Sequence, residues 1–298
     1  MNAPLVTDQL TKCFGSHTAL NKLTLEIPAG RVVGLLGRNG SGKTTLLNLA
    51  CGLTLPTSGT CTTLGKLAGE LDTPELSRLG VVFQDGRLLE WMTVEQQLAF
   101  SASFYPTWDK ARERHLLREL DLASGFSKIA QLSPGDRQKV GVALAVCHHP
   151  SLLLLDEPMS ALDPIARARL LEFLLDLIRE DGCTIVISSH ILADVEKVID
   201  WVVCLDDGGL AVSAPLDELQ ESYAEWIVSA QADSLPAKFV EPFVLTQEVS
   251  ARQARLRVRP EATAMEQFRT RHRVEITSRP LNLEELFPLL VKERRAIR

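Results

Sequence analysis

Several features are scarce in this 298-residue sequence, and each scarcity narrows what the protein can be. No apolar run reaches the roughly 20 residues that cross a bilayer. The longest candidate, 170–178, is interrupted by Glu172 and Asp176. The first residues lack the basic and apolar regions of a signal peptide. The six cysteines stand singly, without a C-x-x-C pair, and therefore indicate neither a zinc site nor a disulfide framework.

Basic residues are also fewer than acidic ones. The net charge of −6 and the pI near 5.6 argue against nucleic-acid binding as the main function, so no nucleic-acid partner is expected. Hydrophobic residues make up 45% of the chain, which is enough for a full core. The length suits one large domain with an appendage, or two domains.

The most informative stretch is the glycine-rich segment 37–44, which fits the pattern G-x-x-x-x-G-K-[ST]. An apolar run at 32–36 predicts a buried strand before it, and residues 45–50 predict a helix after it. Glycines let backbone N–H groups surround phosphate oxygens, and the helix N-terminus adds a partial positive charge. Lys43 can then reach the β- and γ-phosphates, and Thr44 can ligate Mg²⁺. The alternative is a chance glycine-rich turn with a surface lysine, which the flanking elements disfavour.

Three further predicted strands end in polar side chains. They are 80–83 before Gln84, 152–155 before Asp156 and Glu157, and 184–189 before His190. In an open α/β sheet such strand ends face the ligand crevice. Two adjacent buried acids are costly unless a cation is near, and Mg²⁺ beside the phosphate loop would supply that cation. Taken alone, Gln84 is weak evidence, and a single histidine is more often a structural hydrogen-bonder than a catalyst.

The remaining patterns predict antiparallel strands before residue 36, a helical insert and an appendage. Residues 91–130 show helical patterns with a break at Pro106, and a further helix is predicted from about 137 to 148. From about residue 221 aliphatic alternation replaces the glycine-rich motifs, which predicts a small α/β appendage without a catalytic or metal constellation. A lone phenylalanine such as Phe14 usually lies in a core, but its polar neighbours also suit an exposed ring.

In this order, the motifs of residues 5–220 resemble the nucleotide-binding subunit of an ATP-binding cassette (ABC) transporter. The resemblance implies an α/β fold of the P-loop NTPase, ABC-type class. Its mixed-sheet core would carry an antiparallel β subdomain and a helical subdomain inserted at about 86–135. Residues 1–220 would form this ATPase domain, and residues 221–298 a small C-terminal α/β domain.

The resemblance also implies a role for each motif, with ATP and Mg²⁺ as cofactors. Glu157, His190 and Gln84 would be catalytic, as the catalytic glutamate, the switch histidine and the Q-loop residue. Thr44, Gln84 and Asp156 would hold Mg²⁺. Phe14 would stack on adenine, and the ATP-binding residues would be Phe14, Gly37, Arg38, Asn39, Gly40, Ser41, Gly42, Lys43, Thr44, Thr45, Ser133, Gly135 and Asp163.

The signature segment of the family departs from its usual form. Residues 132–136 are L-S-P-G-D where L-S-G-G-Q is usual. Ser133 and Gly135, which carry the phosphate contact, are kept. Asp136 places an extra anion near a triphosphate, which is unfavourable, so we expect a working but slower site.

The implied partners are a second copy of the chain and a separately encoded transmembrane permease. Two copies would enclose two ATP molecules head-to-tail, each signature helix covering the other copy's nucleotide. The permease would hold the subunit at the cytoplasmic face of the inner membrane. Leu88, Leu89, Trp91 and Met92 form a candidate docking cluster, with packing inside the insert as the alternative. The segments 188–192 and 281–287 are similar to bacterial export-type ATPases, which suggests an exporter.

Two other functions compete with that of a transporter ATPase subunit. Soluble cassette ATPases of translation carry two cassettes, and those of DNA repair carry long coiled coils, but this chain has one cassette and no such insert. A non-hydrolysing ATP-binding regulator is opposed by the intact Lys43, Asp156, Glu157 and His190, and mildly favoured by Asp136.

Overall fold

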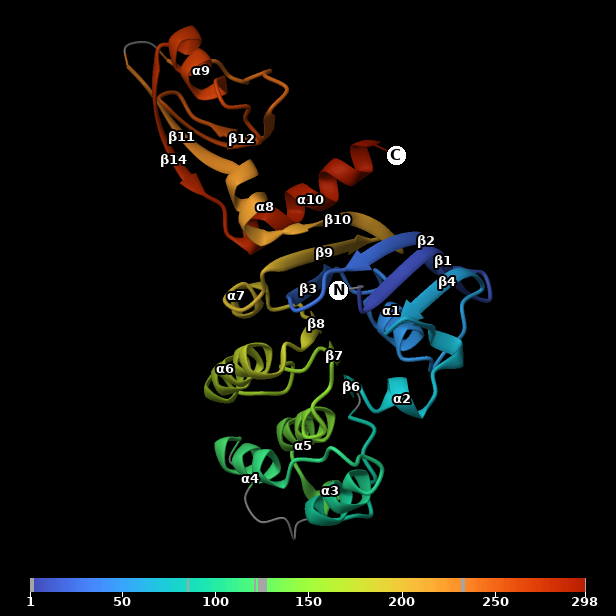
Figure 1. Cartoon of the computed structure of the whole chain (residues 1–298). Coiled ribbons are helices and arrows are strands. Elements are labelled where there is room, and N and C mark those ends of the chain that lie inside the picture. The colour runs from blue at the N-terminus through green and yellow to red at the C-terminus, as the bar shows by residue number, and fades with distance from the viewer. Residues whose placement is uncertain (1–2, 85, 121, 123–127, 232–233, 298) are drawn as a thin grey trace. The chain divides into compact units, whose positions relative to one another are not determined.

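The computed structural model describes residues 3–84, 86–120, 122, 128–231 and 234–297 (Figure 1). It divides the chain into two units, Met1–Ser213 and Ala214–Arg298. The division falls before the boundary expected after residue 220, because helix α8 (Leu216–Ser222) belongs to the second unit. Among the described residues, no helix combines the length and the apolar character that crossing a membrane needs.

The first unit is built on a six-stranded sheet in the order β10-β9-β3-β8-β7-β6. Its strands are β3 (Val32–Gly37), β6 (Leu79–Val82), β7 (Leu152–Asp156), β8 (Thr184–Ser188), β9 (Trp201–Asp206) and β10 (Gly209–Pro215). The five strands from β9 to β6 pair in parallel. Every residue of β7 and β8 is buried, as expected for parallel strands covered on both faces. Their carboxyl ends therefore meet at one edge of the sheet.

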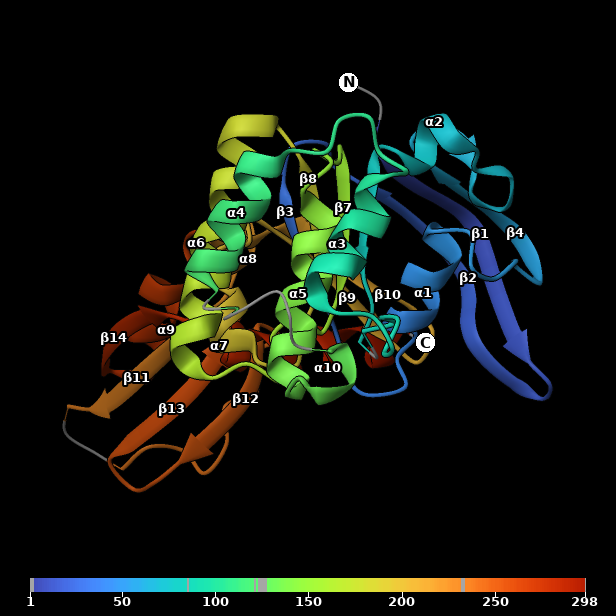
Figure 2. The same cartoon turned by 90° about the horizontal axis from the view of Figure 1, so that it is seen from below.

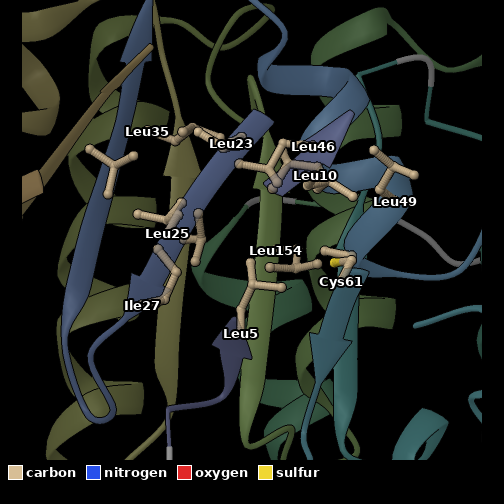
Figure 3. Close-up of a cluster of buried hydrophobic side chains, with 14 of the residues drawn as sticks. Leu5, Leu10, Leu23, Leu25, Ile27, Leu35, Leu46, Leu49, Cys61 and Leu154 are labelled. Carbon is tan, nitrogen blue, oxygen red and sulfur yellow. The ribbon is translucent and has the colours of Figure 1, made fainter. Parts of the chain in front are cut away.

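A smaller antiparallel sheet in the order β2-β1-β4-β5 packs with the first helix. Its elements are β1 (Leu5–Phe14), β2 (His17–Ile27), β4 (Ser58–Thr63) and β5 (Lys66–Leu67), and the helix is α1 (Lys43–Ala50). Buried and exposed side chains alternate towards the end of β2, which places one face of the strand inward. Figure 3 shows the resulting core, where side chains of β1, β2, β3, β4, β7 and α1 gather.

Strands β4 and β5 were not predicted from the sequence. Their residues, rich in threonine and glycine, lack apolar alternation, so local sequence carries no strand pattern. They are strands because β1 pairs with β4 along its length, starting with Leu5 opposite Thr63. Tertiary pairing therefore decides this part of the fold.

The helical insert contains α3 (Val94–Ala102), α4 (Lys110–Glu119), the short helix η2 (Ile129–Gln131) and α5 (Pro134–Val146). Helix α5 contacts both α3 and α4, and the three helices lie together in Figure 2. Pro106 lies in the break between α3 and α4, as predicted, whereas residues 121 and 123–127 lie outside the described residues. The prediction that the next helix begins near residue 137 is wrong. It begins at Pro134 because the Ser133 side chain caps it and proline has no N–H to leave unbonded.

Other helices complete the first unit: η1 (Ala68–Glu70), α2 (Thr73–Leu76), α6 (Pro164–Asp181) and α7 (Leu192–Val195). The sequence of residues 191–198 predicts one helix over that whole range, but α7 ends at Val195. Beyond α7 the chain tightens into turns, with the N–H of Val198 bonded to the carbonyl oxygen of Val195, three residues back, at 3.0 Å.

The second unit has an antiparallel four-stranded sheet in the order β12-β13-β11-β14. Besides α8 it contains β11 (Ala224–Ala230), β12 (Val244–Val249), β13 (Gln253–Val258), α9 (Ala264–His272), β14 (Val274–Pro280) and α10 (Leu283–Ile297). Its core is aromatic. The ring of Phe268 lies 5.6 Å from that of Trp226 and 5.1 Å from that of Phe239, centroid to centroid. Each unit thus has a hydrophobic core of its own.

Leu154 tests the core of the first unit, because it is fully buried in β7. Leu154→Ala should lower the free energy of unfolding by about 2–5 kcal/mol, since the lost methyl groups leave a cavity. Urea unfolding followed by circular dichroism measures the loss. Leu53→Ala is the matched control, because that side chain is 52% exposed, and it should change stability by less than about 0.5 kcal/mol. Equal losses in the two variants would contradict this core.

Candidate nucleotide-binding site

The loop that joins β3 to α1 leaves no room for side chains at two of its glycines. A Cβ atom on Gly37 would lie 2.2 Å from Oγ of Ser41 and 2.7 Å from the carbonyl oxygen of Leu205. Gly42 has a φ of +102°, and a Cβ atom there would lie 2.6 Å from the carbonyl oxygen of Ala19. Both positions therefore require glycine, and the loop backbone is left open to a ligand.

A cavity of about 430 Å³ opens at this loop. It is lined by Phe14, His17, Ala19, Asn39, Gly40, Ser41, Gly42, Lys43, Thr44, Thr45, Gln84, Asp156 and Glu157. The volume falls in the range typical of small-molecule and cofactor sites. The cavity thus brings together the β1–β2 hairpin, the phosphate loop and the carboxyl ends of the central strands, which are far apart in the sequence.

Phe14 lies at the edge of this cavity with 53% of its surface exposed, so it is not a core residue. The Nζ atom of Lys12 lies 4.9 Å from the centre of its ring. His17, which sequence reasoning missed, pairs with Phe14 across the hairpin and also lines the cavity. Its position two residues beyond a Gly-containing turn was the only available clue.

Two polar side chains of the phosphate loop are buried without their full set of partners. The Oγ atom of Ser41 has no hydrogen-bond partner among the described residues. Lys43 donates to the carbonyl oxygens of Gly37 at 2.8 Å and Arg38 at 3.4 Å. Burial lowers the pKa of Lys43, while Glu157 and Asp156 oppose that shift. An unpaired hydroxyl and a buried ammonium at a glycine cradle fit a phosphate group.

The two acids at the end of β7 are held by a serine of the neighbouring strand. Ser188 donates its hydroxyl proton to Oδ1 of Asp156 at 2.7 Å and accepts the N–H of Glu157 at 2.9 Å. Both carboxylates are buried. Buried acids need such partners, because an unpaired buried charge is strongly destabilising. From the sequence, Ser188 was assigned to a strand and to the segment 188–192, but not to the site.

Glu157 faces His190 across the sheet edge. The Nδ1 atom of His190 lies 2.6 Å from Oε2 of Glu157, and the His190 N–H donates to the same oxygen at 3.3 Å. Glu157 has a φ of +51°, a strained backbone conformation for a non-glycine residue, of the kind that clusters at functional sites. His190 is not among the residues lining the cavity and reaches it through Glu157.

Gln138 is a second residue that sequence reasoning missed. It is buried in α5, donates its side-chain amide to the carbonyl oxygen of Glu157 at 2.6 Å, and accepts the N–H of Ala161 at 3.1 Å. In the sequence, the signal that could have found it is a glutamine among the apolar residues of a helix. It ties α5 to the segment that carries the catalytic candidate.

Gln84 lies between the nucleotide cavity and a second one. The second cavity, of about 380 Å³, is lined by Thr44, Asn48, Phe83, Gln84, Arg87 and Asp156. The guanidinium of Arg87 lies 4.3 Å from the centre of the Phe83 ring. Gln84, Thr44 and Asp156 are common to both cavities, so the three expected Mg²⁺ residues lie together.

The oxygen atoms of Thr44, Gln84 and Asp156 fit Mg²⁺ binding only when a nucleotide supplies further ligands. Within the described ranges, no group of three or more His, Cys, Asp or Glu side chains could hold a metal ion. Mg²⁺ is usually bound by one or two carboxylates together with substrate phosphates. One buried carboxylate, Asp156, next to the hydroxyl of Thr44 and a phosphate cradle, fits that arrangement.

Five of the predicted ATP contacts do not line this cavity. They are Ser133, Gly135 and Asp163, and also Gly37 and Arg38. Gly37 and Arg38 nevertheless contact the lining, since both carbonyl oxygens accept from Lys43. Gly135 packs against the segment that contains Asp163, since a Cβ atom on Gly135 would lie 2.7 Å from the carbonyl oxygen of Ala161.

Known proteins are similar to this chain in sequence. Residues 20–160 match the ABC transporter family. The bacitracin transport ATP-binding protein BcrA of Enterococcus faecalis is 34% identical over 233 residues, covering 77% of this chain and 76% of that protein. The aliphatic sulfonates import ATP-binding protein SsuB of Escherichia coli (strain K12) is 34% identical over 216 residues, covering 72% and 82%.

A solved structure extends the likeness to three dimensions. The dimeric post-hydrolysis state of the ATP-binding cassette MJ0796, bound to ADP and Pi, has a TM-score of 0.64 and 28% identity to this chain, and covers 71% of it and 98% of that chain. A chain so similar to BcrA over most of its length belongs to the ABC transporter family, as an ATP-binding subunit that hydrolyses ATP.

Proposed function

We propose that this ATPase subunit powers a transporter that moves its substrate out of the cell, through ATP-driven association of two copies. The observation that carries the catalytic part is the Glu157 carboxylate, which lines the nucleotide cavity and is held by His190 at 2.6 Å. Direction is a separate question, because one relative is named for bacitracin transport and another for sulfonate import.

Export is favoured by two segments of the sequence. Residues 281–287 in the unit Ala214–Arg298 and residues 188–192 after β8 resemble export-type ATPases.

ATP binds, in this proposal, with its triphosphate on the loop between β3 and α1 and its adenine on Phe14. The N–H groups of residues 38–45 and the Ser41 hydroxyl hold phosphate oxygens, and Lys43 turns from its carbonyl partners to the β- and γ-phosphates. Thr44, Gln84 and Asp156 hold the ion that accompanies ATP. When bound, Mg²⁺ neutralises charge on the phosphate oxygens.

Glu157 acts on the attacking water. Its carboxylate accepts a hydrogen bond from water beside the γ-phosphate, and the bond from His190 fixes the side chain's direction. The positive φ of Glu157 also sets the direction of its side chain, because it turns the residue away from the strand. Gln138 holds the backbone carbonyl on the other side. The base is thus positioned by contacts from β8 and α5 before ATP arrives.

A second copy completes the site. Ser133, Gly135 and Asp163 do not line their own chain's described cavity, so they are available to the nucleotide of a partner. In a head-to-tail pair related by a two-fold axis, each copy contributes these residues to the nucleotide site of the other. The dimeric form of the similar cassette MJ0796 supports this arrangement.

A transmembrane permease, encoded separately, contacts the helical insert and holds the subunit at the cytoplasmic face of the membrane. The members of the candidate docking cluster differ in exposure to solvent. Met92 is buried, while Trp91 is 68% exposed. Phe100 and Phe104 are exposed further along the insert and pack edge-to-face, with centroids 5.1 Å apart. Exposed aromatic side chains of this kind mark protein interfaces.

Phe14→Ala tests the adenine contact. Stacking of a base on an aromatic ring contributes about 1–3 kcal/mol, so affinity for ATP should fall about tenfold or more with little loss of fold. Isothermal titration calorimetry with ATP and Mg²⁺ measures it. Phe104→Ala, an exposed aromatic outside the cavity, is the control and should bind like the parent. Unchanged affinity in Phe14→Ala would remove the residue from the site.

Trp91→Ala tests the docking surface and the direction of transport together. In inverted membrane vesicles, which expose the cytoplasmic face, an exporter with the parent subunit should accumulate substrate inside when ATP is added. Bacitracin is the first substrate to try, because the BcrA relatives are named for it. Trp91→Ala should lose most of this uptake and co-purify poorly with the permease, because interface hot spots are enriched in tryptophan.

The control for this test is Leu76→Ala, an exposed leucine outside the insert, which should transport like the parent. ATP binding by the isolated Trp91→Ala subunit should also be unchanged. Equal loss of ATP binding and transport would instead assign Trp91 to folding. Uptake only into right-side-out vesicles would make the transporter an importer.

Glu157→Gln tests catalysis, because it keeps the shape of the side chain and removes its charge. A positioned general base contributes about 10²–10⁴ in rate, so turnover should fall by that factor while ATP still binds and holds two copies together. Turnover and size-exclusion chromatography with ATP and Mg²⁺ are measured on one sample. Turnover at the parent rate would exclude Glu157 as the base. A slow variant that stays monomeric in the presence of permease would remove the two-copy arrangement.

A further inference from the structure

Within the signature segment, Ser133 and Asp136 are hydrogen-bonded to each other. The Oγ atom of Ser133 accepts the N–H of Asp136 at 3.1 Å and donates its own proton to Oδ2 of Asp136 at 2.7 Å. A serine hydroxyl has one proton to donate. While that proton is bonded to Asp136, Ser133 cannot donate it to a phosphate.

Lys139 holds the other side of the same carboxylate. It lies one turn along α5, and its Nζ atom is 3.0 Å from Oδ1 of Asp136. Burial acts to raise the pKa of Asp136, but the bonds from Ser133 and Lys139 outweigh it and hold that pKa below its usual range. The Lys139 side chain is only 13% exposed, so solvent screens this pair less than an ordinary surface pair. Asp136 is therefore ionised, and Lys139 balances its charge.

We propose that Asp136 and Lys139 form a latch on Ser133 that sets the ATP concentration at which two copies associate. The latch rests on the proposed function, in which Ser133 of one copy contacts the γ-phosphate bound by the other. The phosphate then competes with the Asp136 carboxylate for the Ser133 proton. Asp136 and Lys139 are positioning residues, because each acts on the phosphate through Ser133.

The latch predicts opposite effects for its two members. Asp136→Asn removes the charge and weakens the hold on the Ser133 proton, so the apparent KM for ATP should fall. Lys139→Met removes the counter-charge and leaves the carboxylate facing the triphosphate, so KM should rise. Hydrogen bonds to charged groups suggest shifts of about tenfold in each direction. The double variant should resemble Asp136→Asn, because Lys139 then has no charge left to balance.

The measurements use the full chain with ATP and Mg²⁺. Steady-state turnover across ATP concentration gives KM and kcat, and sedimentation velocity gives the ATP concentration at half-association. Affinity of the single copy for ATP, measured below the protein concentration of association, should be unchanged, since Asp136 and Lys139 are not among the residues lining the described cavity. Lys110→Met is the matched control. Lys110 also pairs with an acid three residues on, Glu113, but outside the signature segment, so KM should stay at the parent value.

Thermal unfolding checks that the helix cap survives, since Ser133 still accepts the backbone N–H of residue 136 in every variant. If Asp136→Asn is unstable, Asp136→Gln replaces it and should shift KM the same way. A purely structural role would lower the melting temperature and kcat of both single variants, with KM moving in one direction or not at all. Either result overturns the latch.

The outcome also separates this latch from the function on which it rests. If the parent chain never associates with ATP and Mg²⁺, with or without permease, the two-copy arrangement and the latch fail together. If the parent associates and both single variants associate at the same ATP concentration as the parent, the latch alone fails.

Discussion

The site depends on how closely the backbone of the β3–α1 loop approaches its neighbours. β3 lies between β8 and β9, so the loop starts from the interior of a parallel sheet. Gly37 then fits against Ser41 and Gly42 against Ala19, at separations that no side chain would allow. A larger residue would push the loop into the space that phosphates occupy. Because Ala19 belongs to β2, the same contact fixes the hairpin that carries the aromatic end of the cavity.

The register of strands β7 and β8 positions the two acids, as close backbone contacts position the loop. Asp156 lies opposite Ser188 in the parallel pairing of β7 with β8. One hydroxyl can therefore donate to the Asp156 carboxylate and accept from the Glu157 backbone. This bond stabilises the buried Asp156 carboxylate, while the buried Glu157 carboxylate has its own partner in His190. The same register therefore serves both the folding of the sheet and the placement of the two acids.

Helix α5 connects the parts of the site that lie far apart. Ser133 caps its N-terminus, and Gln138 in its second turn bonds both the Glu157 carbonyl and the Ala161 N–H. A contact at the start of α5 therefore acts on the same backbone that carries Glu157, the proposed base. In the proposed two-copy arrangement, this short path gives the second copy a physical route to influence hydrolysis.

The sequence by itself determined the features whose causes are local. Glycine spacing predicted the phosphate loop, apolar runs predicted the central strands, and strand-end acids predicted the site's edge. The start of α5 was misplaced although its signals, the Ser133 cap and Pro134, are local. The end of α7 was also misplaced. Strands β4 and β5 were missed because β4 pairs with β1, which is distant in the chain. His17 and Gln138 were missed for the same reason. Only tertiary structure decided that Phe14 and Glu157 share one cavity, since contacts between residues so far apart in the chain follow from packing, which sequence patterns do not encode.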